Sequence, residues 1–181
     1  MTGPGDAGGG DASAGERAGP QWTEVRAGVV DVYVVRPNAP DGAGGTTWRV
    51  LAVQRSLDTR CPTAWETVHG RIEPGERPEQ AAVREVREET GLEVGRLYNV
   101  TVQPFYLHRF GVVQMAVVFA IFVAEPAAVT LGAEHQAYEW LPVAAARERF
   151  VWPREREALD HVVHLLGRGD AGPVEDVLRV R

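Results

Sequence analysis

Stretches rich in β-branched and aromatic residues alternate along this chain with stretches rich in glycine, proline and polar turn residues. Such a pattern predicts strands separated by loops. We expect long strands over residues 24–37, 48–56, 97–107 and 112–123, and short ones over 65–70 and 137–142. The first two strands would pair as a hairpin around a loop at residues 38–47.

The pattern changes to helical periodicity after the loop at residues 71–78. Pro78 suits the first turn of a helix, and Gly91 is typical of the residue that ends one. Between them, small and apolar residues recur every three or four positions, as on the buried side of an amphipathic helix. We therefore predict a helix over residues 78–90 with a buried stripe of Ala82, Val83, Val86 and Thr90.

Two more helices are expected over residues 143–149 and 153–167. The second one places four apolar residues on one side: Leu159, Val162, Val163 and Leu166. Residues 174–181 are compatible with either disorder or a last short strand. Mixed strands with helices on both faces indicate an α/β sandwich.

The length of 181 residues suits one domain with a sizeable core. We place this domain over residues 22–167 and treat 168–181 as a C-terminal tail. Residues 1–21 are rich in glycine and alanine and contain no apolar segment of the kind that a signal peptide needs. We expect them to form a flexible tail, and we expect the protein to be cytoplasmic.

Charge and cysteine content exclude several classes of protein. The net charge of -6 argues against a nucleic-acid binder, and no run reaches the roughly 20 apolar residues that span a membrane. Cys61 is the only cysteine, which excludes an internal disulfide and a CxxC zinc site, and we expect it to be partly buried. Small phosphorylated molecules remain as candidate partners, and the sequence leaves open whether the protein forms a homodimer.

Three carboxylates crowd one side of the predicted helix 78–90. Glu85, Glu88 and Glu89 are helical neighbours, and Arg84 can reach Glu88 at the i+4 position, which leaves two carboxylates without a helical partner. Like charges at this distance cost free energy unless a cation lies among them, and Mg²⁺ prefers carboxylate, water and phosphate oxygens. The alternative is an ordinary solvated acidic face.

The spacing around these carboxylates matches a long motif, G-x5-E-x7-R-E-U-x-E-E-x-G-U, in which U is aliphatic. Every fixed position of this Nudix box is present: Gly70, Glu76, Arg84, Glu85, Val86, Glu88, Glu89, Gly91 and Leu92. The chain therefore resembles a Nudix hydrolase, and the order of the expected elements fits that family over residues 22–167.

The resemblance implies a Nudix-type α-β-α sandwich with a mixed β-sheet. It also implies Mg²⁺- or Mn²⁺-dependent hydrolysis of a nucleoside diphosphate linked to another moiety. Carried over by position, the metal ligands would be the carboxylates of Glu85, Glu88 and Glu89, joined by the backbone carbonyl of His69. Glu85 or Glu88 would accept the proton of the attacking water, although in this family the base also occurs on loops outside the box.

The remaining box residues would have structural roles. The resemblance implies that Glu76 and Arg84 pair and brace the loop against the helix. Gly70 and Gly91 are the box glycines, and glycine allows the close approach of backbone and side chains at such turns.

A second stretch, residues 133–142, contains Glu-His-x-Ala-Tyr-x-Trp-Leu and is similar to the same region of bacterial dihydroneopterin triphosphate pyrophosphatases. In such relatives a glutamate at this place completes the metal site, which makes Glu134 a candidate ligand. The alternative is a polar turn before a strand, with Trp140 and Leu141 in the core. The chain lacks the Pro-Gly-Gly that often precedes the box in the nucleotide-sanitising branch.

The substrate-binding residues are not assigned by the sequence. Aromatic and polar side chains are the candidates, although aromatic residues of the core outnumber those that stack on a substrate: Phe105, Tyr106, His108, Arg109 and Trp152. His161 and His164 lie three positions apart without a third ligand, so we expect solvated histidines there and no zinc.

The leading hypothesis is a Mg²⁺- or Mn²⁺-dependent pyrophosphohydrolase acting on a nucleotide or on dihydroneopterin triphosphate. The alternatives are a dinucleoside polyphosphate hydrolase, a Nudix-fold binding or regulatory module without catalysis, and an interaction domain with a solvated acidic face. Modules that have lost catalysis typically lose box glutamates, and all of them are present here.

Overall fold

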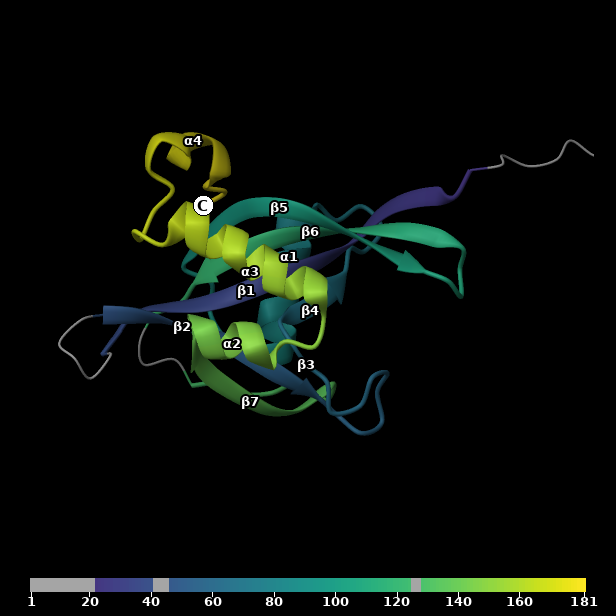
Figure 1. The fold of residues 1–181 in the computed structure, drawn as a ribbon, viewed down its shortest axis with the longest axis horizontal. Coiled ribbons are helices and arrows are strands. Elements are labelled where there is room, and N and C mark those ends of the chain that lie inside the picture. The colour runs from purple at the N-terminus through teal and green to yellow at the C-terminus, as the bar shows by residue number, and fades with distance from the viewer. Residues whose placement is uncertain (1–21, 41–45, 125–127) are drawn as a thin grey trace, which may run out of the picture.

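The computed structural model describes residues 22–40, 46–124 and 128–181. The expected N-terminal tail lies outside these residues. Within these residues, seven strands form one sheet with the order β3-β2-β1-β6-β5, in which β4 also pairs with β1 and β7 with β2 (Figure 1). The strands are β1 (Glu24–Pro40), β2 (Thr46–Arg55), β3 (Trp65–Glu66), β4 (Val68–Arg71), β5 (Arg96–Leu107), β6 (Val112–Phe122) and β7 (His135–Pro142).

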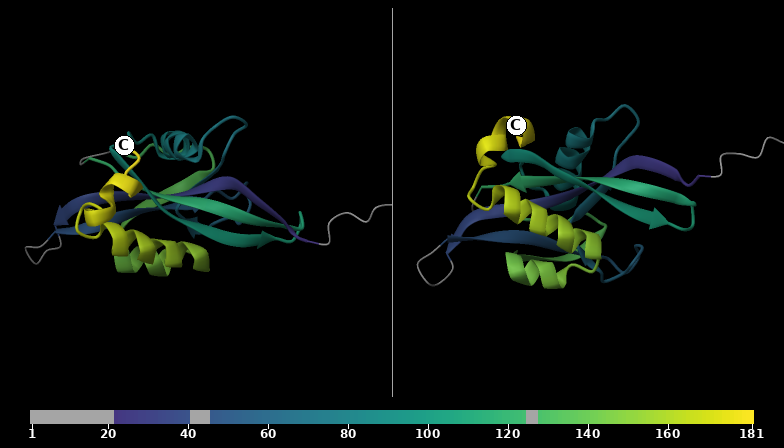
Figure 2. Two further views of the ribbon diagram at one scale, coloured as in Figure 1. Left: turned by 90° about the horizontal axis from the view of Figure 1, so that it is seen from above. Right: turned by 45° about the horizontal axis from the view of Figure 1, so that its top comes forward.

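The sheet is mixed and lies between two layers of helices. β1 and β6 run parallel, and the other pairs are antiparallel. Helix α1 (Pro78–Thr90) covers one face, while α2 (Val143–Arg149) and α3 (Pro153–Leu166) cover the other (Figure 2). The predicted α-β-α sandwich with a mixed β-sheet is confirmed.

Alternation along β1 divides the core between the two faces. Val30, Val32 and Val34 belong to the apolar cluster beneath α1, whereas Tyr33 and Val35 belong to the cluster beneath α2 and α3. On α1, the predicted stripe is buried at Ala82, Val86 and Thr90 and partly buried at Val83; Ala81 and Glu89 are buried as well.

Three expectations about local structure were wrong. The single strand expected at residues 65–70 is two strands, because β3 pairs with β2 and β4 pairs with β1, so the chain crosses between them at Thr67. β1 continues beyond its expected end to Pro40, where it still pairs with β2. Cys61 is exposed rather than partly buried, and it lies in a turn with a φ of 54°.

Residues 168–181 pack against the edge of the sheet. They contain the short helices η1 (Gly172–Val174) and α4 (Glu175–Leu178), followed by an isolated bridge between Arg179 and Tyr98 of β5. The hydroxyl of Tyr98 donates to Glu175 at 2.9 Å, and the Val180 amide donates to the carbonyl of Leu97 at 2.8 Å. Among the described residues, no helix is long and apolar enough to cross a membrane.

Candidate active site

Helix α1 presents the three box glutamates in different surroundings. The Glu88 side chain is 59% exposed, whereas those of Glu85 and Glu89 are 12% and 8% exposed. The helix begins at Pro78 and ends at Thr90, and the following Gly91 has a φ of 67°, which glycine adopts without strain. The carboxylates therefore range from a solvated group to one held inside the protein.

Arg84 ties the loop before α1 to the helix. Its guanidinium donates to both oxygens of Glu76, at 3.0 and 2.9 Å, and to the Arg71 carbonyl at 2.8 Å. The pairing that the resemblance implied between Arg84 and Glu76 is thus present, and it holds the pKa of the Glu76 carboxyl below its usual range. The Nη1 atom of Arg84 also donates to Glu85 at 2.8 Å and to Glu88 at 3.1 Å.

Gly70 leaves the space that the Glu85 carboxylate occupies. A Cβ atom at position 70 would overlap the Cδ, Oε1 and Cγ atoms of Glu85. Burial raises the pKa of the Glu85 carboxyl, while its pairing with Arg84 acts in the opposite direction. The box glycine is therefore required so that a carboxylate of α1 can lie against the backbone of β4.

Glu89 is the most enclosed of the box glutamates. Burial, followed by the charges of Glu85, Glu134 and Glu66, raises the pKa of its carboxyl to about 9. Its Oε2 atom is buried and has no hydrogen-bond partner. A carboxylate in this position repels its acidic neighbours unless a proton or a cation lies beside it.

The segment before β7 docks on the C-terminal end of α1. The amide of Thr130 donates to the Thr90 carbonyl at 2.8 Å, and that of Gly132 donates to the Glu89 carbonyl at 2.9 Å. These bonds satisfy helix carbonyls that have no partner within the helix. A Cβ atom at position 132 would lie 2.7 Å from the Glu88 carbonyl oxygen, so the close approach depends on glycine.

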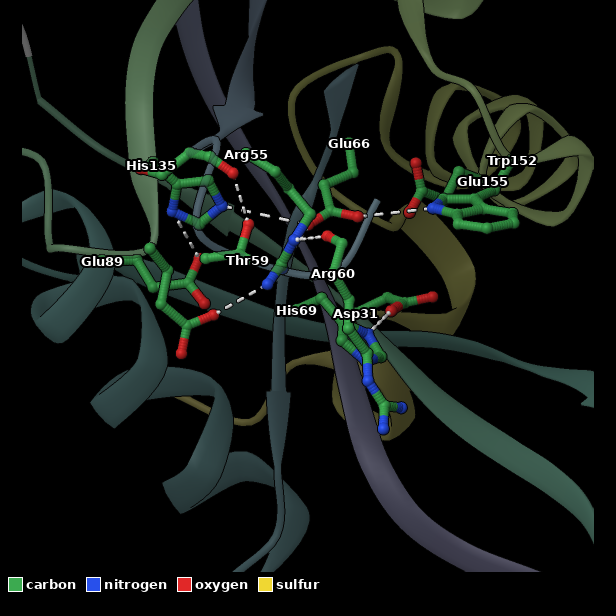
Figure 3. A network of polar contacts seen from close by, with 12 residues as sticks. Asp31, Arg55, Thr59, Arg60, Glu66, His69, Glu89, His135, Trp152 and Glu155 are labelled. Carbon is green, nitrogen blue, oxygen red and sulfur yellow. Dashed lines mark hydrogen bonds and ion pairs between the residues drawn. The ribbon is translucent and has the colours of Figure 1, made fainter. Parts of the chain in front are cut away.

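This docking brings Glu134 to the acidic side of α1. The Glu134 side chain is 62% exposed, and its Oε2 atom accepts from Arg55 at 3.2 Å. Its backbone carbonyl accepts from the Ser56 amide at 2.8 Å. The next residue, His135, is buried, and Figure 3 shows its ring between Glu89 and Glu66.

His69 lies beside the carboxylates, but its side chain has a partner of its own. Its Nδ1 atom is 2.6 Å from Oδ1 of Asp31, a carboxylate with no exposed surface. Burial lowers the pKa of the His69 imidazole, and the charges of Glu66 and Glu85 act against that. Asp31 is also bound by Arg154 from the start of α3.

The candidate substrate residues separate into two groups. Phe105 lies on the face of the sheet covered by α3, with the Arg154 guanidinium 4.5 Å from its ring centre. Trp152 precedes α3 and donates from Nε1 to Glu66 at 3.3 Å. The other three candidates are exposed at the end of the β5–β6 hairpin, and the structure records no contact between them and these groups: Tyr106, His108 and Arg109.

Sequence reasoning did not single out Arg55, Glu66 or His135. Glu66 lies in a segment expected to be a short strand, and a single buried carboxylate there leaves no periodic pattern in the sequence. His135 was visible only as the neighbour of Glu134 in the stretch 133–142. Arg55 ends a strand far from the box in sequence, and only the pairing of β2 with β3 and β7 brings it to the site.

The donor set fits a hard divalent cation. Its members are carboxylate oxygens, and one of them, Oε2 of Glu89, is buried without a hydrogen-bond partner. The guanidinium of Arg84 supplies positive charge to Glu85 and Glu88. In the described part of the chain, no three His, Cys, Asp or Glu side chains already converge on one point. Cation binding would therefore require the exposed Glu88 and Glu134 side chains to turn inward.

Comparisons with known proteins agree with this geometry. The family model described as the NUDIX domain matches residues 26–162. An octanoyltransferase from Myxococcus xanthus is 36% identical over 137 residues, which cover 72% of this chain, and the chain spans only 35% of that relative's length. A dihydroneopterin triphosphate diphosphatase from Escherichia coli is 30% identical over 129 residues, which cover 65% of this chain and 84% of the relative.

Among solved structures, the Ap4A hydrolase of C. elegans in a binary complex superposes with a TM-score of 0.64 at 21% identity. The match covers 77% of this chain and 97% of that one. The fold, the complete box and the matches together place the chain in the Nudix family. It belongs to the Nudix hydrolase family over residues 26–162.

Proposed function

We propose that this enzyme uses Mg²⁺ or Mn²⁺ to hydrolyse a triphosphate carried on a heterocycle, with dihydroneopterin triphosphate as the first candidate substrate. The observation that carries the proposal is the gathering of carboxylates around Glu89, whose buried Oε2 atom has no partner. The diphosphatase from Escherichia coli supports the choice of substrate, because the match covers most of its length.

The side-chain ligands that we propose come from two elements. Glu85, Glu88 and Glu89 belong to α1, and Glu134 belongs to the segment docked on the end of that helix. The backbone carbonyl of His69 is the fifth proposed ligand. A bound divalent cation would offset the charge of the phosphate chain and lower the pKa of the attacking water.

A carboxylate must also accept the proton of that water. Glu85 and Glu88 are the proposed bases within the box, and Glu134 is the proposed base outside it. The exposure of Glu88 and Glu134 supports this role, since an exposed carboxylate can reach water and pass the proton to solvent.

The face covered by α3 supports binding of a flat ring. Phe105 is partly buried beneath Arg154, and Asp31 fixes the position of that arginine. Trp152 is 36% exposed at the adjoining end of α3. Aromatic side chains and a guanidinium stack on heterocycles.

Two other functions stay as alternatives. The superposition with an Ap4A hydrolase keeps a dinucleoside polyphosphate hydrolase under consideration. A binding or regulatory module without catalysis is the other, and the complete set of box glutamates argues against it. The octanoyltransferase relative is much longer than the matched segment, so the similarity concerns only part of that protein.

The test is a hydrolysis screen with Mg²⁺ and with Mn²⁺. The substrates are dihydroneopterin triphosphate, ordinary and oxidised nucleoside triphosphates, and Ap4A, with the products separated by chromatography. We expect metal-dependent release of pyrophosphate and the highest kcat/KM with dihydroneopterin triphosphate. A higher kcat/KM with Ap4A would favour the dinucleoside polyphosphate alternative, and no turnover of any substrate would favour the regulatory module.

A further inference from the structure

His135 is buried without the partners that a buried imidazole needs. Its side chain is 1% exposed, and neither Nδ1 nor Nε2 has a hydrogen-bond partner. Buried polar groups in folded proteins are almost always hydrogen-bonded, so an unpaired ring with two polar atoms requires an explanation. An ordinary core position does not provide one, because an apolar side chain would avoid this cost.

The two groups that face the ring are both carboxylates. The Nδ1 atom of His135 is 3.8 Å from Oε2 of Glu89, and its Nε2 atom is 3.9 Å from Oε1 of Glu66 (Figure 3). The Glu89 oxygen is itself buried without a partner. A shift of about 1 Å in each carboxylate would bring both pairs within hydrogen-bond distance. The ring is therefore placed to bridge the two carboxylates.

Arg55 extends this arrangement to the other side of the site. Its Nη1 atom donates to Oε1 of Glu66 at 2.8 Å, and its Nη2 atom donates to Oε2 of Glu134 at 3.2 Å. The Nε atom of Arg55 donates to the Arg60 carbonyl at 2.7 Å, which fixes the guanidinium. The polar contacts thus run from Glu89 to Glu134 through three side chains that belong to three different strands.

We propose that Arg55, Glu66 and His135 are positioning residues of the metal site. They set the separation between the carboxylates of Glu89 and Glu134, one from α1 and the other from the segment before β7. Groups that hold metal ligands in place typically change metal affinity by about 10- to 100-fold when they are removed. This inference rests on the proposed function, because it takes Glu89 and Glu134 as ligands.

The test is direct Mn²⁺ binding, measured from the paramagnetic resonance signal of free Mn²⁺. We expect His135→Ala to weaken Mn²⁺ binding by at least ~10-fold, and His135→Gln, whose amide can donate and accept, to recover part of the loss. The metal concentration for half-maximal turnover should rise by the same factor. The KM for substrate at saturating metal should stay unchanged, because His135 does not touch the substrate in this account.

The matched control is His161→Ala, since His161 is exposed on α3. It should bind Mn²⁺ as the unaltered protein does. Thermal melts in EDTA check that each variant is folded, and unfolding of both His135 variants would overturn the proposal. So would equal Mn²⁺ affinity in His135→Ala and His161→Ala, or a lack of Mn²⁺ binding by the unaltered protein. If Mn²⁺ binding weakens as expected but no substrate is hydrolysed, the inference stands and the proposed function fails.

Discussion

At the scale of single residues, the acidic groups of the site differ in how freely they can move. Glu88 and Glu134 are exposed and held only by arginine side chains, whereas Glu89 is enclosed and its backbone carbonyl is bound by Gly132. A fixed buried carboxylate defines where a cation would lie, and the exposed ones can close around it. This division of roles leads to separate expectations for each glutamate.

Glu134→Gln should reduce turnover strongly, and the response to added metal identifies its role. If Glu134 is a ligand, the variant binds metal more weakly, so excess Mg²⁺ or Mn²⁺ recovers part of the rate. If it is the base, metal affinity stays nearly intact and excess metal does not help. The measurement is turnover as a function of metal concentration. An unchanged rate at limiting metal would remove Glu134 from the site.

Glu155 gives a prediction about pH and stability. Burial raises the pKa of its carboxyl well above the usual value, so the folded chain keeps a proton that the unfolded chain loses above about pH 4.3. The free energy of unfolding therefore falls as the pH rises. Glutamine has no proton to lose. As the pH rises from 6 to 8, the stability of Glu155→Gln should therefore increase relative to that of the unaltered protein, by up to about 1.4 kcal/mol per pH unit.

Urea unfolding at the two pH values measures this difference. Glu157→Gln is the control, because Glu157 is exposed on the same helix. It should leave the pH dependence of stability as it is. If Glu155→Gln has the same pH dependence as the control, Glu155 does not hold a buried proton.

At the scale of elements, the site is made by helix α1 and the two segments that fix its position. The loop before the helix is bound through Arg84 and Glu76, and the segment 130–135 caps the opposite end. Two glycines with no room for a Cβ atom also pack against α1, Gly70 against the Glu85 side chain and Gly132 against the Glu88 carbonyl. The carboxylates are thus positioned by backbone packing as well as by the helix itself.

Gly70→Ala should displace the Glu85 carboxylate without unfolding the protein, because the Glu85 side chain can move. Displacement of a catalytic group by about 1 Å can cost roughly 100-fold in rate, so we expect kcat to fall by about 10- to 100-fold with little change in melting temperature. Gly28→Ala is the control, since its Cβ atom would meet Gln114 at an ordinary 3.4 Å. Equal kcat in both variants would show that Gly70 does not position Glu85.

Some of these elements could be predicted from the sequence and others could not, because only some of them leave a periodic pattern of residues. Helix α1 and the long strands β5 and β6 were predictable, because periodicity and turn residues mark them. The division of residues 65–70 into β3 and β4 was not, since two short pairings with different partners leave no periodic trace. The site shows the same difference. The spacing of the box residues identified them in the sequence, whereas Arg55 and Glu66 are brought into contact only by the pairing of β2 with β3.

At the scale of the whole molecule, the last fourteen residues are packed against the sheet. Ala171 is buried, Leu178 packs on the cluster beneath α3, and Arg96 donates to the Gly169 carbonyl at 2.5 Å. The segment also pairs with the edge of β5. Residues 168–181 therefore contribute to the stability of the domain.

Removal of residues 168–181 should lower the melting temperature by roughly 4–8 °C. This corresponds to a loss of about 2 kcal/mol for a chain of this length, from exposed apolar surface and lost hydrogen bonds. The comparison is a chain that lacks residues 2–20, whose composition predicts no effect on melting temperature. A melting temperature that does not fall after the C-terminal truncation would contradict the stabilising role.

The central claim is that the box carboxylates hold a divalent cation for phosphoanhydride hydrolysis. The most direct measurement is turnover of dihydroneopterin triphosphate by the unaltered protein and by Glu88→Gln, in Mg²⁺ and in EDTA. Glutamine keeps the shape of Glu88 and removes its charge. We predict turnover in Mg²⁺, none in EDTA, and a fall of at least ~100-fold in the variant, with a melting temperature in EDTA that does not drop. Near-normal turnover by folded Glu88→Gln, or turnover that persists in EDTA, would contradict the account.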